Sequence, residues 1–517
     1  MRGLATAAEK TVSAPAASSV WATNGGIYFG HQIVAPANLE RPLSGKEKEL
    51  SVPPSAAVKT SWQFLPNENR YTQDRHVLTI GPNGSGKTRK LLMPNLFRLR
   101  DWSCVVIDPK GELAAHTAVF RASREGHKVV VIDPFRAVEK NYPDLFAKHP
   151  EILRSKGYNP VASLDPESDR FVDDAKTLAT ALIRTDNTRD PYWPMAAQSL
   201  VKGLLLTTRL VHPNDASLSM LRDDLSWPAD VLADILKDRV AAYRDTHPAV
   251  ASSLGQFTNY TPEDRELNGI VRTALVQTDW LDSPQMQRDL QGEVIDFASL
   301  KETPTTIYLV LPPEYLASHG TWLRLMVTSI LLPLLRSVEK PKVPVLFMLD
   351  EFAQLGHMEV IQNNYALMRG FYVKLWTIWQ DLTQAKRLYK DQWESFVSNA
   401  GIIHAFAPQD LTTRDYLSRM ADERTQWHRR EGSSVNFAMR GGLSGGSSQG
   451  DVHIQERVLK PYELAALDQD EAVLFSRRGQ VTLSVLPQPD LLAEPTPSDS
   501  VSVADRLREA RVDIENP

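Results

Sequence analysis

The sequence contains almost no cysteine. Among its 517 residues there is a single one, Cys104, so an intramolecular disulfide is excluded, which is consistent with a reducing compartment. Cys104 lies in an apolar run, where we expect a core residue. The histidines, including His116 and His127, do not show the spacing of metal ligands. A cysteine nucleophile and a histidine-based metal site therefore find no support in the sequence.

Long apolar runs are also missing. The longest, from Leu325 to Leu335, is bounded by Arg324 and Arg336 and is too short to cross a bilayer. The stretch from Thr11 to Leu39 lacks charges, but its Ser, Asn, Gly and Pro residues make it too polar to insert. We find no basic segment followed by an apolar one, as in a secretory signal. The sequence thus predicts a soluble chain.

A surplus of positive charge is absent as well. The 58 Lys and Arg residues face 63 Asp and Glu residues, which gives a formal net charge of −5. A general electrostatic attraction to nucleic acid is therefore not predicted, and any such contact must be local. The length exceeds what one hydrophobic core serves, so we expect two or three structural units.

The pattern along the chain divides it into four parts. Runs typical of buried strands alternate with helical segments, which predicts an α/β domain with a mostly parallel sheet. A stretch with helical spacing of apolar residues interrupts this domain and predicts an all-α insertion. The predicted parts are a loosely ordered lead-in (1–70), the α/β domain (71–159 and 301–487, with a flexible Gly/Ser loop at 427–453), the insertion (160–300) and an acidic tail (488–517).

The most informative motif is a phosphate-binding loop that fits G-x-x-x-x-G-K-[ST] without mismatch. It follows the apolar run His76–Ile80 and precedes the helical pattern Arg89–Leu99. In such loops backbone N–H groups hold phosphates at the start of a helix. Lys87 can reach the β- and γ-phosphates, and the Thr88 hydroxyl can bind Mg²⁺. The predicted ATP-binding residues are Gly81, Pro82, Asn83, Gly84, Ser85, Gly86, Lys87 and Thr88.

A pair of carboxylates supplies the second half of a nucleotide-hydrolysing site. The apolar run Val345–Leu349 ends in Asp350 and Glu351. We expect Asp350 to hold Mg²⁺ with Thr88, and Glu351 to polarise the attacking water. An acidic turn after a strand is the simpler alternative, but the intact phosphate-binding loop favours the catalytic interpretation.

Two further polar segments follow predicted strands. Gln380 closes the run Tyr372–Trp379, where it can position water or sense the γ-phosphate, or else cap the next helix. The segment from Asp108 to Glu112 follows the strand Cys104–Ile107. It either lines the site or only caps and turns, and the sequence does not favour one of these.

Together these motifs resemble the coupling proteins of type IV secretion and conjugation systems. The resemblance runs from about Gly81 to Phe475, and it includes features at both ends of the insertion. Its motifs are the phosphate-binding loop with Pro94-Asn95, Asp108–Glu112, Gly157–Pro160, Asp190–Trp193 with Ala197, Pro304–Pro312, Leu323–Leu325, Leu349–Phe352, Trp379-Gln380, Asn399–Gly401 and Tyr416–Arg419.

The resemblance implies a RecA-like P-loop ATPase that binds ATP and Mg²⁺ between the subunits of a homo-hexamer. It also implies a trans-acting catalytic arginine, and Arg369 matches that position by spacing; a surface arginine at a helix C-terminus is the alternative. The implied cargo is a relaxase–DNA complex, with its single-stranded DNA, or protein effectors. The implied partners are channel subunits of the secretion system at the bacterial inner membrane.

The chain departs from that family in showing no membrane-spanning helix. We expect either a soluble variant, a chain that borrows a partner's anchor or one that lacks an upstream part, and in each case a cytoplasmic protein held peripherally at the inner membrane. Two other functions stay open on the sequence. One is a general hexameric DNA translocase, and the other is a nucleotide-gated adaptor that binds ATP and recruits cargo without hydrolysis.

Overall fold

The computed structural model describes residues 26–34, 63–185, 190–421, 423–438, 442–476 and 481–486. The predicted tail, 488–517, and most of the predicted lead-in lie outside these residues. In the described part an eleven-stranded sheet runs in the order β2-β1-β13-β12-β9-β3-β8-β7-β4-β6-β5. Its strands are β1 (Ile27–Val34), β2 (Gln63–Tyr71), β3 (His76–Ile80), β4 (Ser103–Ile107), β5 (Lys128–Ile132), β6 (Thr305–Leu309), β7 (Val345–Leu349), β8 (Val373–Trp379), β9 (Ala400–Phe406), β12 (Glu471–Ser476) and β13 (Val481–Val485).

The seven strands from β9 to β5 are parallel, and the others extend the sheet antiparallel. Every residue of β3, β4, β6, β7 and β8 is buried. Buried parallel strands are near-continuous apolar runs, which is why the sequence pattern predicted them. The parallel α/β core is thus confirmed. Strands β1 and β2, which fall within the predicted lead-in, were not predicted.

Helices cover both faces of the sheet. Consecutive residues of β4, such as Val105 and Val106, belong to two different hydrophobic clusters, one on each face. The helices of the sheet unit are α2 (Met93–Arg98), α3 (Glu112–Ala122), α4 (Ala137–Asn141), α5 (Pro143–Lys148), α6 (Pro150–Leu153), α14 (Pro313–Leu334), α15 (Glu359–Asn364), α16 (Leu382–Tyr389), α17 (Glu394–Asn399), α18 (Leu411–Met420) and α19 (Pro461–Ala465).

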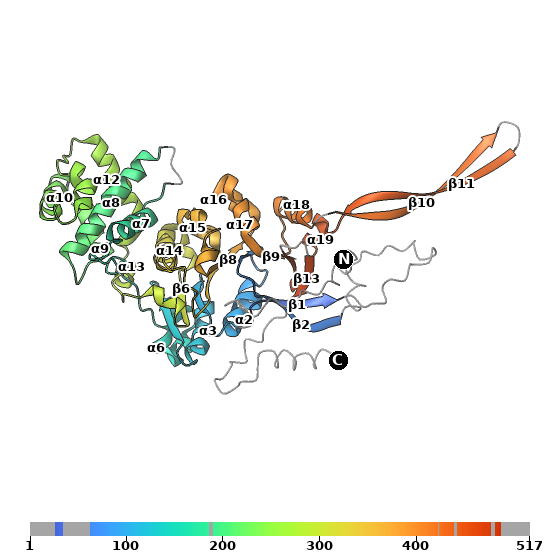
Figure 1. The fold of residues 1–517 in the computed structure, drawn as a ribbon, viewed down its shortest axis with the longest axis horizontal. Coiled ribbons are helices and arrows are strands. Elements are labelled where there is room, and N and C mark those ends of the chain that lie inside the picture. Colours follow the sequence, from blue (N-terminus) through green and yellow to red (C-terminus); the bar gives the residue numbers. More distant parts are fainter. Residues whose placement is uncertain are drawn as a thin grey trace.

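A helical unit lies beside the far edge of the sheet (Figure 1). Its described residues between Asn159 and Pro304 form helices and turns without a strand. The chain passes into it after β5 and returns at β6. Its helices are α7 (Phe171–Leu182), α8 (Tyr192–Val211), α9 (Leu218–Ser226), α10 (Ala229–Tyr243), α11 (Pro248–Leu254), α12 (Arg265–Gln277) and α13 (Pro284–Asp289).

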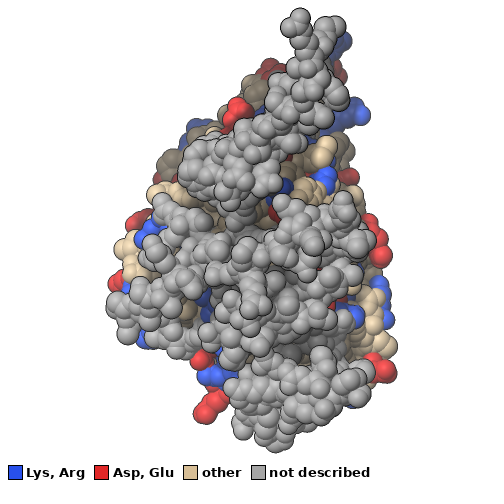
Figure 2. Space-filling model, turned by 90° about the vertical axis from the view of Figure 1, so that its right-hand side faces the viewer, with Lys and Arg blue, Asp and Glu red and all other residues tan. Residues whose placement is uncertain are grey.

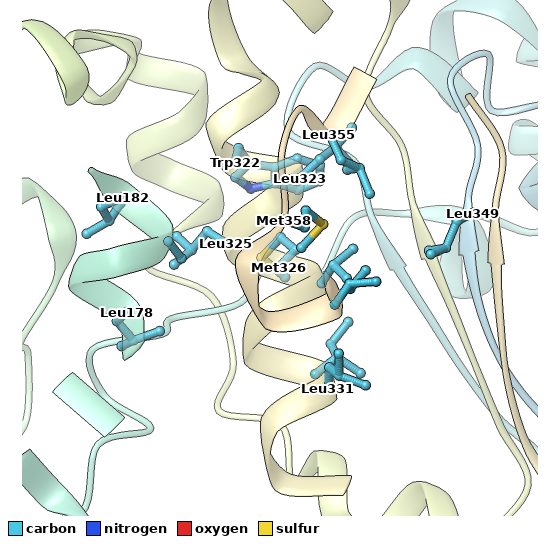
Figure 3. Close-up of a cluster of buried hydrophobic side chains, with 14 of the residues drawn as sticks. Leu178, Leu182, Trp322, Leu323, Leu325, Met326, Leu331, Leu349, Leu355 and Met358 are labelled. Atoms are coloured by element: carbon cyan, nitrogen blue, oxygen red, sulfur yellow. The ribbon is translucent and has the colours of Figure 1, made fainter. Parts of the chain in front are cut away.

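The apolar run that is too short for a membrane span forms part of α14. This helix carries Trp322, Leu325 and Met326 between α7 on one side and the sheet on the other (Figure 3). Apolar contacts on both sides explain why the run lacks a polar face. Within the described residues no helix is long and apolar enough to span a bilayer.

The predicted Gly/Ser loop at 427–453 has a different structure. Here β10 (Glu423–Ala438) and β11 (Gly442–Arg457) pair in an antiparallel ribbon that extends away from the sheet (Figure 1). Backbone hydrogen bonds hold such a ribbon and do not depend on side-chain type. The many glycine and serine residues therefore led to the wrong prediction of a loop. From the ribbon end of the molecule, the visible described acidic and basic side chains are interspersed around the rim (Figure 2).

Candidate nucleotide-binding site

The phosphate-binding loop connects β3 to a short π-helix, η3 (Lys87–Leu92), that continues into α2. Gly84 and Gly86 have φ angles of +79° and +80°, a conformation that favours glycine. A Cβ on Gly86 would also lie 2.9 Å from Cδ of Lys90. The predicted helix over 89–99 therefore exists, but it begins with π geometry, which is frequent at functional sites.

Lys87 lies across its own loop. Its Nζ donates hydrogen bonds to the carbonyl oxygens of Gly81 (2.8 Å) and Pro82 (2.9 Å). Burial lowers the pKa of Lys87, while the negative charges of Asp350 and Glu351 act in the opposite direction. The ammonium group is thus close to both predicted carboxylates.

The loop also holds a polar group that needs a partner. Ser85 Oγ is buried and has no hydrogen-bond partner among the described residues. Buried hydroxyls are normally paired, so this atom is suited to an oxygen-rich ligand. The half-buried Thr88 and the carboxylate of Asp350 are hard oxygen donors of the kind that Mg²⁺ prefers. The residues present therefore fit a nucleotide with its Mg²⁺.

The acidic pair stands at the end of β7, as the sequence predicted. Asp350 is 7 % exposed, and burial, followed by the charge of Glu351, raises its pKa to about 6. Its Oδ1 accepts a hydrogen bond of 3.1 Å from the N–H of Glu351. Glu351 adopts the left-handed region, with φ +51°. Such a conformation is costly for a non-glycine residue and is commonest at functional sites.

Gln380 follows β8, which lies between β3 and β7 in the sheet. Its side-chain Nε2 donates a hydrogen bond of 2.9 Å to Oε2 of Glu351. The capping alternative does not hold, because the N-cap of α16 is Asp381, whose carboxylate accepts from the N–H of Gln384. The structure thus brings Gln380 to the acidic pair.

Asp108 and Glu112, whose roles the sequence left open, have two different sets of contacts. Asp108 Oδ2 accepts a hydrogen bond of 2.8 Å from the N–H of Ala114 at the start of α3. Burial raises the pKa of Asp108 to about 7, and the charge of Asp350 contributes in the same direction. Asp108 therefore caps a helix and also faces the acidic pair. Glu112 accepts a hydrogen bond of 2.7 Å from Arg89 Nε, which connects η3 to α3.

Arg369 lies at the opposite end of the strands, where the chain enters β8. It belongs to the 3₁₀ turn η8 (Met368–Phe371) just before β8, whereas Gln380 lies just after that strand. Seven strand residues span roughly 23 Å. Arg369 pairs instead with Asp74, at 2.6 Å, just before β3. The structure therefore does not bring Arg369 to the phosphate-binding loop of its own chain.

Sequence reasoning missed two side chains near the site. The positive charge of Lys110 acts on Asp350 and lowers its pKa, against the larger effect of burial. Asn95 is fully buried. Its side chain accepts a hydrogen bond from the N–H of Tyr28 and donates one to the carbonyl of Tyr28, which connects β1 to α2. Asn95 belongs to a motif singled out in the sequence, but β1 had not been predicted as its partner.

The comparison with known families now decides the assignment. The sequence model described as "Type IV secretory system Conjugative DNA transfer" matches residues 38–481. The chain belongs to this family. The conjugal transfer protein TraG of Escherichia coli is 27 % identical over 432 residues, covering 79 % of this chain and 64 % of that protein. The coupling protein VirD4 of Bartonella quintana is 23 % identical, covering 90 % and 70 %. The chain thus spans about two thirds of these relatives.

Solved structures of the conjugative coupling protein TrwB share the fold of this chain. One, bound to sulfate, aligns with a TM-score of 0.58 at 16 % identity, covering 91 % of this chain and 96 % of that one. Another, solved with ADP and Mg²⁺, has a TM-score of 0.56 at 16 % identity, covering 94 % and 98 %. At this identity the likeness establishes the RecA-like P-loop fold, which agrees with the resemblance in the sequence.

Proposed function

We propose that the chain is an ATP-hydrolysing coupling protein of a type IV secretion or conjugation system. The observation that carries this proposal is the hydrogen bond between Gln380 and Glu351, beside a phosphate-binding loop whose Lys87 is close to the same carboxylates. These groups follow three different strands, β3, β7 and β8, and meet at the carboxyl ends of those strands. A chain that only bound nucleotide would not need the acid and the glutamine to converge there.

In the proposed site the backbone N–H groups of Gly84 to Thr88 bind the ATP phosphates. Lys87 exchanges its loop carbonyls for the β- and γ-phosphate oxygens. Thr88 and Asp350 would hold Mg²⁺, which neutralises charge on the phosphates. Glu351 accepts the proton of the attacking water, and Gln380 fixes the orientation of that carboxylate. The TrwB structures with a non-hydrolysable ATP analogue and with ADP and Mg²⁺ support these ligands.

We assign Arg369 to the site of a neighbouring subunit. Its distance from its own phosphate-binding loop supports action in trans, where it would stabilise the charge developing on the γ-phosphate. This assignment implies that ATP binds between subunits, in keeping with the homo-hexamer of the sequence-based hypothesis. Arg369 is 51 % exposed and can therefore exchange Asp74 for a neighbour's nucleotide.

The cargo in this proposal is a relaxase-bound single strand of DNA or an effector protein, delivered to channel subunits at the inner membrane. Membership of the conjugative DNA transfer family and the names of the TraG and VirD4 relatives support it. We further propose that the predicted insertion, 160–300, engages the cargo, because it stands apart from the strands that carry the nucleotide site.

ATP turnover of the purified chain, with and without single-stranded DNA and a relaxase, tests this function. We expect stimulation by cargo and loss of turnover in Lys87→Ala and Glu351→Gln. The exposed Gln354, three residues from Glu351, offers Gln354→Ala as a matched control with unchanged turnover. ATP binding without hydrolysis under every cargo condition would contradict the proposal and favour the non-hydrolysing adaptor.

A further inference from the structure

The end of α7 is a meeting point of the helical unit and the sheet unit. Leu182, the last residue of α7, lies beside α14 (Figure 3). Four consecutive backbone carbonyls at this end accept hydrogen bonds from side chains of other helices. They are those of Ala181 (2.7 Å) and Leu182 (3.4 Å), which accept from Arg324 of α14, of Ile183 (2.8 Å), which accepts from Gln198 of α8, and of Arg184 (3.1 Å), which accepts from Gln277 of α12. We call residues 181–184 the junction segment.

The junction segment is attached to both units. Its first two carbonyls are bonded to α14 of the sheet unit, and its last two are bonded to α8 and α12 of the helical unit. Between them Ile183 leaves the helical conformation, with φ −107° and ψ +114°. Hinge motions are absorbed by a few residues at the ends of elements. A displacement of the helical unit relative to the sheet is therefore expected at Arg184.

Arg184 is held along its backbone by a single side chain. Gln277 Nε2 donates to the carbonyl of Arg184, and Gln277 Oε1 accepts a hydrogen bond from the N–H of Arg184. A side-chain amide has both a donor and an acceptor, so it satisfies both backbone groups. The position of Arg184 consequently follows that of Gln277, which is the last residue of α12.

The guanidinium group of Arg184 reaches into the sheet unit and lies against Gly356. A Cβ on Gly356 would be only 2.9 Å from Nη2 and 3.2 Å from Cζ of Arg184. Gly356 has φ +69° and ψ −158°, a region that is essentially restricted to glycine. Residue 356 is therefore glycine for two reasons, its own backbone conformation and the close approach of the arginine.

Gly356 ends the turn that begins at Glu351. The N–H of Gln354 donates a hydrogen bond of 2.8 Å to the carbonyl of Glu351, and the N–H of Gly356 donates one of 3.2 Å to the carbonyl of Ala353. Both ends of the turn have a positive φ, +51° at Glu351 and +69° at Gly356. A displacement of Gly356 is therefore transmitted to Glu351 along a short hydrogen-bonded turn.

We propose that Arg184 is a positioning residue that couples the helical unit to the carboxylate of Glu351, through the turn that ends at Gly356. The inference rests on the proposed function, in which Glu351 accepts the proton of the attacking water. Cargo that engages the helical unit would act on Glu351 through this contact. Because a coupling between two sites is reciprocal, nucleotide at the phosphate-binding loop must also act on the junction segment.

Hydrogen–deuterium exchange of the full chain, with and without a non-hydrolysable ATP analogue and Mg²⁺, tests the coupling. In the wild type we expect exchange in peptides that cover residues 181–184 to slow at least threefold when the analogue binds. Arg184→Gln should bind the analogue with unchanged affinity and lose this slowing. Arg184→Lys keeps the charge and the aliphatic stem, so it should fold as the wild type does, but it should lose at least half of the slowing.

Steady-state turnover supplies the second readout. Arg184→Gln should lower kcat about tenfold with an unchanged KM for ATP, because Glu351 loses its orientation while the contacts to the nucleotide remain. The exposed Arg244 on the helical unit offers a matched control, Arg244→Gln, with wild-type exchange and turnover. Thermal midpoints equal to that of the wild type show that the variants are folded.

The outcomes separate this inference from the proposed function. Slowing that persists in Arg184→Gln would overturn the inference alone, and so would wild-type exchange that does not respond to bound analogue. Slowing without ATP hydrolysis would support the coupling and contradict the proposed function. A chain that does not bind the analogue would contradict both.

Discussion

The side-chain amide of Gln380 donates a hydrogen bond of 2.9 Å to the carboxylate of Glu351, across the tips of two neighbouring strands. The hydrogen bond to Oε2 fixes the orientation of the Glu351 carboxylate, and this leaves Oε1 to accept a hydrogen bond from a water molecule. This arrangement suits a group that must orient a water molecule, and it does not require that Gln380 itself contact the nucleotide.

Replacing Gln380 with alanine should therefore lower the rate of ATP turnover while leaving ATP affinity nearly unchanged. We expect kcat to fall by roughly 10- to 100-fold, because orientation of the base is lost but the base remains. Steady-state turnover and equilibrium binding of a fluorescent ATP analogue measure the two quantities. A loss of affinity with kcat preserved would assign Gln380 to binding.

The ionised carboxylate of Asp350 should destabilise the folded chain. Its pKa is higher in the folded chain, about 6, than the ordinary 3.8, so ionisation at neutral pH opposes folding by about 3 kcal/mol. This opposition is absent below pH 3.8 and complete above pH 6. We expect Asp350→Asn to raise the thermal midpoint at pH 7.5, with the gain shrinking towards pH 4. The exposed Asp391 provides a control, because Asp391→Asn should leave the thermal midpoint unchanged.

The same pKa predicts how Mg²⁺ binding depends on pH. Below about pH 6 a proton competes with the metal for Asp350, so the apparent Mg²⁺ affinity should fall by up to tenfold for each pH unit. Titrations of the ATP-bound chain with Mg²⁺ between pH 5 and 8 measure this dependence. A constant affinity over that range would exclude Asp350 as the titrating metal ligand.

Arg369 should act only on a neighbouring subunit. Arg369→Ala alone should abolish turnover and retain ATP binding, since its own phosphate-binding loop is far away. Mixing this variant with Glu351→Gln subunits should restore part of the activity, because some interfaces then combine an intact glutamate with an intact arginine. Asp74→Asn serves as a control that removes the intrachain ion pair and keeps the arginine. Inactive mixtures would contradict action in trans.

Arg324 should be important for the attachment of the helical unit. It is 5 % exposed on α14, and its guanidinium donates to the carbonyls of Ala181 (2.7 Å) and Leu182 (3.4 Å) at the end of α7. Arg324→Met leaves these carbonyls unpaired and should destabilise the chain by about 2 kcal/mol, measured by urea denaturation. The more exposed Arg336, which pairs with Asp174, offers Arg336→Gln as a comparison with a loss below about 1 kcal/mol.

The sequence pattern predicted the central strands closely because they are buried on both faces. The runs His76–Ile80 and Val345–Leu349 coincide with β3 and β7. The antiparallel extension was not predicted. Strands β1 and β2 pair with each other across an intervening segment, and β1 joins β13 near the other end of the chain. Local periodicity contains no information about such distant partners.

The candidate site divides in the same way. Sequence alone determined the phosphate-binding loop, the acidic pair and the glutamine, because each is a local pattern at the end of a buried strand. Only the tertiary structure decided that Gln380 contacts Glu351 and that Arg369 lies at the opposite end of the strands. These relationships follow from strand order, which places β3 beside β8 and β8 beside β7. That order arises from pairing between segments far apart in the chain, and no short stretch of sequence specifies it.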